Sequence, residues 1–405
     1  MERIQFSPPD ITDEEIKAVS AALESGWITT GPRTAKFEQQ IADYCGTPAA
    51  VCMNCATSGL EVALYGLGIG PGDEVIVPAY TYTSTASCIY RLGAKIVFCD
   101  IKPGTFEIDP KSAEKYITSR TKAIMPVDVG GRPCDYLALF KLVESKKNLF
   151  HPGENAFQKA LGRIAIVADA AHSIGATQDG KRTGSIADIS VFSFHAVKNL
   201  TTGEGGAVTW RNIPRFDNAA MSQRMKIYLG NGQTKSSLDK TNNPGQWEYD
   251  IVTLSPSYHM TDYTAALGSV QLERYPELLK KRQHIIQRYD QGLLPLGIKR
   301  LVHLDEHNVS SCHLYLTLIP GVTRQQRDEI IAKMEANGVS VNVHYKPLPM
   351  MTAYKKLGFK IEDYPVAYDV FAHEMSLPLF SRMSDEQVDR VVKVYQEVVG
   401  PYLKK

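Results

Sequence analysis

The 405-residue chain lacks an excess of charge of either sign, because 45 lysine and arginine residues stand against 44 aspartate and glutamate residues. A net charge of +1 creates no global field that would attract nucleic acid or an anionic membrane. The chain also lacks an apolar run long enough to span a bilayer, and Pro8 and Pro9 interrupt the N-terminus where a signal peptide needs an apolar segment. We therefore expect a cytoplasmic protein that recognises its partners locally.

Cysteine is also scarce, since seven residues in an odd, scattered set do not make a disulfide framework. Cys52 and Cys55 have C-x-x-C spacing, but no second pair stands at the spacing of a zinc site, so we expect no bound metal. Glycines at 66, 68, 70 and 72 follow an expected helix and precede an expected strand, the reverse of a dinucleotide-binding loop. They indicate a helix stop and a turn.

Short apolar runs alternate with amphipathic stretches through the first part of the chain. This βαβ rhythm predicts an α/β fold with a mostly parallel sheet covered by helices. The expected strands are 49–53, 74–77, 95–99, 122–127, 164–168 and 189–194, and the expected helices are one from residue 58 and those at 84–92, 110–117 and 136–145.

From residue 271 onward the pattern changes, and it predicts a smaller α+β domain. Its expected elements are a long charged helix, a strand at 313–318, and helices at 324–337 and 385–399. We therefore divide the chain into a large domain, 1–270, and a small C-terminal domain, 271–405. The segment 148–162, rich in proline, glycine and asparagine, indicates an inserted surface loop.

Polar residues follow two of the expected strands, where ligands gather in open parallel sheets. Asp169 ends the run 164–168, and a carboxylate there can pair with a protonated pyridine nitrogen. Aspartate is also a preferred helix N-cap, so that role stays open. The small side chains of Ala170 and Ala171 leave room for a flat ring, and His172 could reach the ring's phenolic oxygen or Asp169.

Lys198 lies just beyond the other strand and before a turn rich in threonine and glycine. Partial desolvation there would lower its pKa and allow the amine to attack an aldehyde, although a solvated surface lysine is the alternative.

Four further residues fit a phosphorylated ring. Thr57 and Ser58 open an expected helix, whose free N–H groups and dipole favour a phosphate, and Ser193 is a third candidate ligand. Simple helix capping is the alternative for the first two. Tyr82 offers a flat face for stacking, although it could equally be a core aromatic.

Taken together, these motifs resemble the DegT/DnrJ/EryC1/StrS family of sugar aminotransferases, which have the pyridoxal-phosphate (PLP) fold-type I. The resemblance covers nearly the whole length. It is carried by the segments 26–32, 56–58, 72–78, 109–110, 169–172, 193–206, 261–268, 313–315 and 376–378, with Phe37 and Glu38.

The resemblance implies a role for each candidate residue. Lys198 would carry PLP as a Schiff base, Asp169 would hold the pyridine nitrogen, and Tyr82 would stack on the ring. Thr57, Ser58 and Ser193 would bind the phosphate, with His172 nearby. The family also implies a homodimer with shared active sites, in which Ser257 replaces an asparagine or lysine that often reaches the partner's cofactor phosphate.

The implied reaction moves an amino group from L-glutamate to a keto sugar, most often a nucleotide-linked 4-keto-6-deoxyhexose. A ketocyclitol aminotransferase is the open alternative. A PLP-dependent sugar dehydratase or a non-catalytic binding protein fits less well, because Lys198 and Asp169 are both present. Two departures, Asp128 and the segment 148–162, are expected near the substrate side, and Tyr345, Lys346 and Pro347 are candidates for the substrate entrance.

Overall fold

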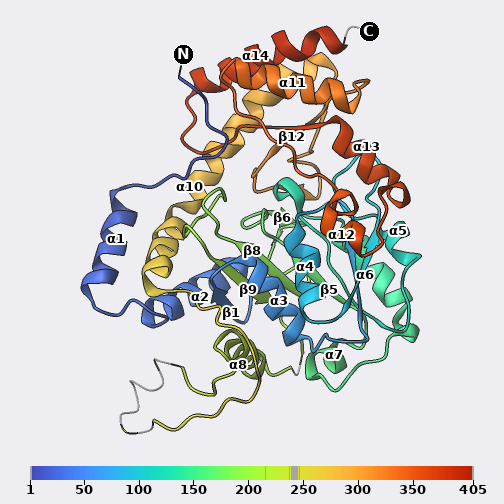
Figure 1. Cartoon of the computed structure of the whole chain (residues 1–405). Helices are drawn as coiled ribbons and strands as arrows, with labels where there is room; N and C mark the ends of the chain where they lie inside the picture. The colour runs from blue at the N-terminus through green and yellow to red at the C-terminus, as the bar shows by residue number, and fades with distance from the viewer. Residues whose placement is uncertain (1, 215, 237, 239–244, 246, 404–405) are drawn as a thin grey trace.

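A computed structural model describes residues 2–214, 216–236, 238, 245 and 247–403 (Figure 1). A seven-stranded sheet forms its centre. The strand order is β1 (Ala50–Met53), β9 (Gly206–Trp210), β8 (Ile189–Ser193), β5 (Ala165–Asp169), β4 (Thr121–Ile124), β2 (Glu74–Pro78) and β3 (Lys95–Cys99). Strand β9 runs antiparallel to both of its neighbours, and the other pairs are parallel. The predicted mostly parallel sheet is thereby confirmed.

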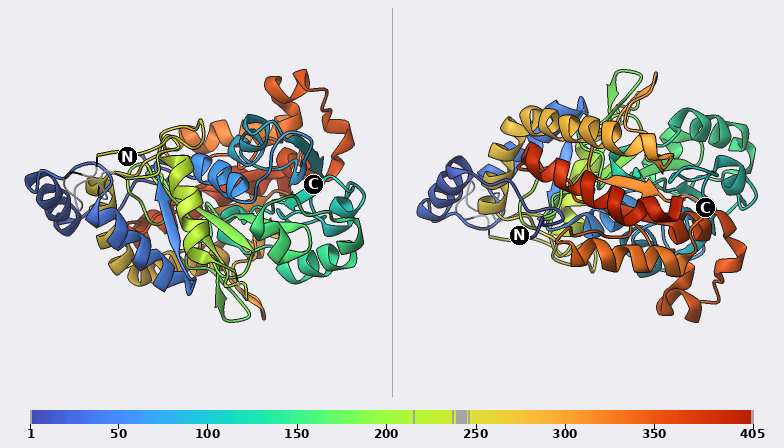
Figure 2. Two further views of the ribbon diagram at one scale, coloured as in Figure 1. Left: turned by 90° about the horizontal axis from the view of Figure 1, so that it is seen from below. Right: turned by 90° about the horizontal axis from the view of Figure 1, so that it is seen from above.

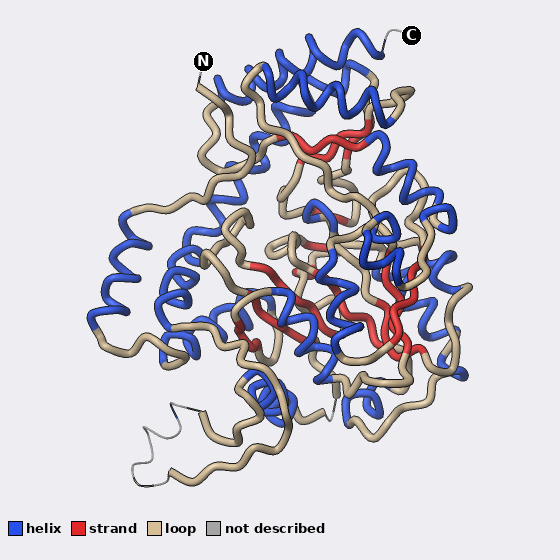
Figure 3. The backbone as a smooth tube through the Cα atoms, in the orientation of Figure 1, coloured by secondary structure: helices blue, strands red, loops and turns tan. Residues whose placement is uncertain are grey.

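Both faces of this sheet are covered by helices, as Figure 3 shows. Successive strand residues point to opposite faces, so Val75 and Val77 belong to one core cluster and Ile76 to the other. The first face packs against α3 (Ala56–Gly66), α4 (Thr83–Arg91) and α8 (Asn218–Leu229). The second packs against α2 (Pro32–Cys45), α6 (Tyr136–Ser145) and the first half of α10 (Asp262–Leu293).

Two element boundaries differ from the sequence-based prediction. The strand expected at 122–127 ends at Ile124, and Pro126, two residues later, has no N–H with which to continue the ladder. Helix α10 begins at Asp262, well before the expected residue 271, and the Asp262 carboxylate accepts the N–H groups of Arg33 and Thr34 at 3.0 and 2.9 Å. The proposed domain boundary therefore falls inside a continuous helix, and the division stays a prediction.

The second half of α10 leads into a smaller unit at the top of Figure 1. A three-stranded sheet of β10 (Lys299–Arg300), β12 (Tyr315–Leu318) and β13 (Glu374–Leu377) is covered by α11 (Arg324–Ala336) and α14 (Asp385–Leu403). Figure 2 shows α14 beside α10, with which it is in contact. Ile4 belongs to this core and pairs with Val339, so the first residues of the chain join the small unit.

The remaining elements are short or peripheral. Within the described part of the chain they are α1 (Asp13–Glu24), α5 (Pro110–Glu114), α7 (Ala156–Leu161), α12 (Thr352–Lys356), α13 (Pro365–His373), β6 (Thr177–Gln178), β7 (Lys181–Arg182), β11 (Asn308–Val309) and five 3-10 turns. Within the described ranges, no helix combines the length and the apolar character that crossing a membrane requires.

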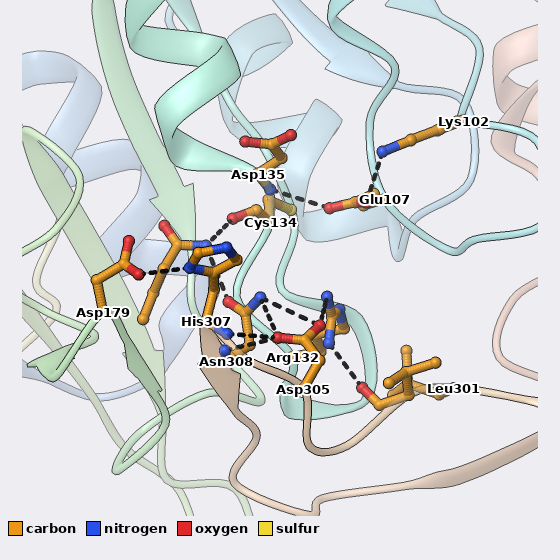
Figure 4. Close-up of polar contacts among 12 residues, drawn as sticks. Lys102, Glu107, Arg132, Cys134, Asp135, Asp179, Leu301, Asp305, His307 and Asn308 are labelled. Carbon is orange, nitrogen blue, oxygen red and sulfur yellow. Dashed lines mark hydrogen bonds and ion pairs between the residues drawn. The ribbon is translucent and has the colours of Figure 1, made fainter.

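Ion pairs fasten the segment 300–309 to the large domain (Figure 4). Arg132 Nη2 donates to Asp305 Oδ2 at 2.6 Å, and His307 Nδ1 lies 2.8 Å from Asp179 Oδ1. Strand β11 pairs with β6 of the large domain beside these contacts. They help to hold the segment that follows β10 against β6 and the loop around Arg132.

Candidate active site

A cavity of about 510 Å³ lies where the carboxyl ends of β5 and β8 face the small domain. This volume is within the range of about 300–1,000 Å³ typical of small-molecule sites. The structure brings six of the eight predicted cofactor-contacting residues to its wall, namely Thr57, Tyr82, Asp169, His172, Ser193 and Lys198. Parallel strands end at the same edge of a sheet, which explains why residues distant in sequence meet here.

Lys198 lies in the turn after β8, where its backbone N–H donates to His195 O at 2.8 Å. The residue is partly buried. Burial lowers the pKa of its amine to about 8, and the carboxylate of Asp169 opposes that shift. A substantial fraction of the amine is therefore unprotonated in mildly alkaline solution, as attack on an aldehyde requires.

Asp169 is the last residue of β5, and its side chain is buried. Its Oδ2 accepts a hydrogen bond from Thr85 Oγ1 at 2.7 Å, and its Oδ1 accepts the N–H of Ala171 at 3.2 Å. Burial raises the pKa of Asp169, whereas these two hydrogen bonds oppose the rise. The chain continues as a turn after Asp169, so the carboxylate does not cap a helix. A buried carboxylate held in this way suits a cationic ring nitrogen.

His172 is held beside Asp169 in a defined tautomer. Its Nδ1 accepts the N–H of Gly130 at 3.2 Å, so the proton of the neutral ring is on Nε2, which lies 3.1 Å from Tyr345 Oη. Burial lowers the pKa of His172 well below its usual value. The ring of His313 lies 4.3 Å from that of His172. Burial also lowers the pKa of His313, so the site contains two neutral imidazoles in tilted contact.

The start of α3 forms another wall of the cavity. Thr57 Oγ1 and Ser84 Oγ lie 2.6 Å apart and both line it. The first N–H groups of a helix have no partner within the helix, and they favour an anion. A Cβ atom at Gly206 would lie 2.7 Å from the backbone nitrogen of Ala56, so this close approach of β9 requires glycine. These features fit a phosphate group.

Two of the predicted ligands lie away from the cavity wall. Ser58 is buried, and its hydroxyl donates to Asn54 Oδ1 at 2.6 Å. Ser257 is exposed, with its Oγ 3.0 Å from His259 Nδ1. The neighbouring Tyr258 carbonyl accepts the N–H of Asn54, so Ser257 lies beside the loop that opens α3.

Tyr82 lines the cavity with 58% of its surface exposed, which excludes the alternative of a core aromatic. Its ring lies 6.1 Å from that of Tyr345, which also lines the cavity. Lys346 and Pro347, the other entrance candidates, do not line it. Stacking of Tyr82 on a ligand stays a prediction.

Several residues that line the cavity were not predicted from the sequence, including Phe6, Ser7, Asn342 and His344. The Phe6 ring stacks on that of His344 at 5.6 Å, and Ser7 Oγ donates to Val197 O at 3.1 Å. No local motif marks the N-terminal pair. They reach the cavity because the segment around Ile4 pairs with the small domain.

Asp128 does not line the cavity, although its backbone N–H donates to Asp169 O at 3.1 Å, and the segment 148–162 lies away from the cavity, contrary to the prediction for that segment. The buried Asp128 carboxylate accepts the hydroxyls of Ser173 and Tyr136 at 2.6 and 2.8 Å, so it braces the core. The segment 148–162 includes α7, and its Asn155 Nδ2 donates to Gly66 O at 2.8 Å. It therefore packs at the far end of α3 from the cavity, because its polar side chains satisfy the last carbonyls of that helix.

Comparison with known proteins identifies a family and several similar aminotransferases. Residues 9–396 match the DegT/DnrJ/EryC1/StrS aminotransferase family. The spore coat polysaccharide biosynthesis protein SpsC of Bacillus subtilis is 35% identical over 403 residues, which cover 98% of this chain and 97% of SpsC. The PLP form of Spr1654 from Streptococcus pneumoniae, assigned as a sugar aminotransferase, has a TM-score of 0.95 at 47% identity and 99% coverage of both chains. PseC of Helicobacter pylori, an aminotransferase involved in the biosynthesis of pseudoaminic acid, has a TM-score of 0.83 at 27% identity, with 99% and 100% coverage.

Proposed function

Because this chain belongs to the DegT/DnrJ/EryC1/StrS aminotransferase family and is a PLP-dependent aminotransferase, we propose that it transfers the amino group of L-glutamate to a keto sugar carried on a nucleotide. The observation that carries this proposal is the meeting of Lys198 and Asp169 in one cavity, at the ends of neighbouring strands. A reactive amine and a buried carboxylate are the two groups that PLP chemistry requires of the protein.

The wall residues fit the cofactor. Lys198 would bind its aldehyde carbon and Asp169 its ring nitrogen, with Tyr82 and His172 beside the ring. The first turn of α3, together with Thr57 and Ser193, would hold its phosphate. Both residues line the cavity, which supports this role. When bound, PLP supplies an electron sink for the negative charge that develops on the substrate carbon.

Lys198 also provides the proton transfers. With PLP bound, the free Nζ of Lys198 would move a proton from the α-carbon of glutamate to the cofactor in the first half-reaction. In the second half-reaction, Nζ would move a proton from the cofactor to the former carbonyl carbon of the acceptor. A pKa of about 8 suits this double role, because the amine can gain and lose a proton near the working pH.

We assign the acceptor to the keto sugars, with a nucleotide-linked 4-keto-6-deoxyhexose as the first choice. The similarity to Spr1654 and PseC supports keto sugars as the class of acceptor. Lys198 is the one lysine or arginine among the described lining residues, so we place the nucleotide diphosphate, which needs cationic partners of its own, outside this cavity. Its remote binding energy could still position the keto group.

The test is to supply glutamate and follow 2-oxoglutarate release with three acceptors: the nucleotide-linked sugar, the same sugar without its nucleotide, and a ketocyclitol. We expect the nucleotide-linked sugar to react at least about tenfold faster than either of the others, because remote contacts contribute to positioning. Equal rates with and without the nucleotide would remove the nucleotide-sugar proposal. A preference for the cyclitol would establish the alternative.

The active form in this proposal is a homodimer. An apolar surface segment, 247–254, supports it, because Trp247 and Leu254 are 77% and 96% exposed. Figure 1 shows this segment, which leads to α10, projecting from the large domain. Contiguous exposed apolar residues mark interaction sites, and a second copy would bury them beside the loop that contains Ser257. That loop adjoins Asn54 at the start of α3, so a partner here would lie close to the active site.

A further inference from the structure

His344 reaches the cavity from the small domain and has a partner behind it. Its Nδ1 lies 2.8 Å from Ser376 Oγ, and Ser376 Oγ lies 2.5 Å from Glu374 Oε1. The other carboxyl oxygen, Oε2, accepts the backbone N–H of His344 at 2.8 Å. These contacts form a continuous chain from a buried carboxyl group, through a hydroxyl, to an imidazole on the cavity wall.

The geometry of β13 (Glu374–Leu377) explains why these hydrogen-bonded side chains lie together. Glu374 and Ser376 are two residues apart on β13, so their side chains lie on the same face, while Met375 and Leu377 point into the small-domain core. The backbone of Asn342 pairs with that of Ser376, which holds the His344 loop alongside the strand. Among the described residues, His344 Nε2 has no hydrogen-bond partner, which leaves it available to a ligand in the cavity.

The protons of such a chain can be arranged in only two ways, because a serine hydroxyl carries one hydrogen. With Glu374 ionised, Ser376 donates to the carboxylate, His344 Nδ1–H donates to Ser376, and Nε2 is an acceptor. With Glu374 protonated, it donates to Ser376, Ser376 donates to Nδ1, and Nε2–H becomes a donor.

We propose that Glu374, acting through Ser376, sets the tautomer of His344, and that with ionised Glu374 the bare Nε2 accepts a hydrogen bond from a hydroxyl group of the sugar substrate. His344 is then a positioning residue that selects a neutral hydroxyl over a carboxylate or phosphate, whose oxygens would repel its lone pair. The substrate part of this inference rests on the proposed function. The tautomer part does not.

The surroundings keep His344 neutral and make Glu374 the titrating member. Burial, aided by the charge of Lys198, lowers the pKa of His344 to about 3. Burial raises the pKa of Glu374 to about 8, against the opposing effects of Ser376, the His344 N–H and Arg327. The titratable or charged groups that face the pair from the surrounding elements are Arg327, Tyr80, Tyr345, Lys198, His172 and His313.

The first test reads the tautomer directly in the holoenzyme without substrate, by NMR of ¹⁵N-labelled histidine between about pH 6 and about pH 10, which brackets the transition. His344→Gln assigns the signal. We expect wild-type His344 to change from Nε2–H to Nδ1–H as the pH rises through about 8. Glu374→Gln should stay Nε2–H throughout, because its amide can only donate to Ser376 once its oxygen accepts the His344 N–H.

A change in the protonation of Lys198, or of the bond that attaches it to the cofactor, could produce a similar NMR change. That change would persist in Glu374→Gln. Ser376→Ala, which interrupts the chain without removing the carboxyl group, should abolish the coupling, whereas Glu329→Gln on the surface of α11 should behave as the wild type. An unchanged wild-type tautomer, or a Glu374→Gln protein that titrates as the wild type does, would overturn the proposal.

The second test measures KM for the sugar acceptor. At about pH 9.5 the Glu374→Gln enzyme should show a KM about three- to tenfold above that of the wild type, the effect of one lost hydrogen bond, with kcat within about twofold. At about pH 6.5 the two KM values should agree, because both proteins then have the same tautomer. A coupled tautomer with an unchanged KM would refute the positioning role. If no keto sugar is accepted at all, the proposed function fails while the NMR result stands.

Discussion

Thr85, in the first turn of α4, donates a 2.7 Å hydrogen bond to Oδ2 of Asp169 at the end of β5. Thr81 Oγ1 lies 2.7 Å from Thr85 Oγ1 and so extends the contact. The buried carboxylate therefore has a dedicated hydroxyl partner that stabilises its ionised form and fixes its orientation. A bound pyridinium would meet a carboxylate that is already positioned.

Removing this hydroxyl should weaken cofactor binding. Hydrogen bonds to charged groups contribute about 1.5–3 kcal/mol, so we expect Thr85→Val to raise the dissociation constant for PLP roughly 10- to 100-fold. Spectroscopic titration of the apo-protein measures this constant. Thr83→Val is the matched control, because the Thr83 hydroxyl contacts Tyr354 and does not line the cavity. Equal effects of the two substitutions would show that Thr85 acts only through the stability of α4.

The covalent attachment site should be Lys198. Borohydride reduction of the holoenzyme followed by peptide mapping should place the cofactor on this residue, and Lys198→Ala should lose both the attachment and turnover, since its amine carries both roles. A label on any other lysine contradicts the assignment.

Attachment should depend on pH in a defined direction. The folded-state pKa of Lys198 is lowered to about 8, so the reactive, neutral amine forms as the pH rises through that value. We expect the rate of PLP attachment to the apo-protein to increase with an inflection near pH 8 in stopped-flow absorbance. Because Asp169 raises the pKa of Lys198, Asp169→Asn should move the inflection to lower pH. An inflection that moves upward would contradict this electrostatic coupling.

The exposed segment 247–254 should be an interface in solution. Replacing Leu254 by glutamate places a charge where we expect burial, so the dimer dissociation constant should rise at least about tenfold, as one unfavourable buried charge exceeds 1.4 kcal/mol. Sedimentation velocity at several concentrations measures it. Leu137→Glu, at a 60% exposed site on α6, is the control and should leave the dimer intact. A fully active monomer would refute the shared-site proposal.

The sequence by itself determined the parts of this protein that depend on local pattern. Alternating strands and helices predicted the sheet, and polar residues after two apolar runs pointed to Asp169 and Lys198. This succeeds because side-chain periodicity follows from backbone geometry, and because parallel strands deliver their carboxyl ends to one edge. The position of Lys198 just beyond an apolar strand also predicted, from the sequence, that burial lowers the pKa of its amine.

The tertiary structure alone decided which distant groups meet. The Asp128 carboxylate does not line the cavity, because it accepts the hydroxyls of Ser173 and Tyr136 in the core behind it. Thr85 is 84 residues from Asp169, and His344 is 32 residues from Ser376, yet each pair shares a hydrogen bond. Such contacts depend on how helices pack on the sheet and how the small domain closes over it. Side-chain hydrogen bonds have no period along the chain, so only packing can bring these partners together.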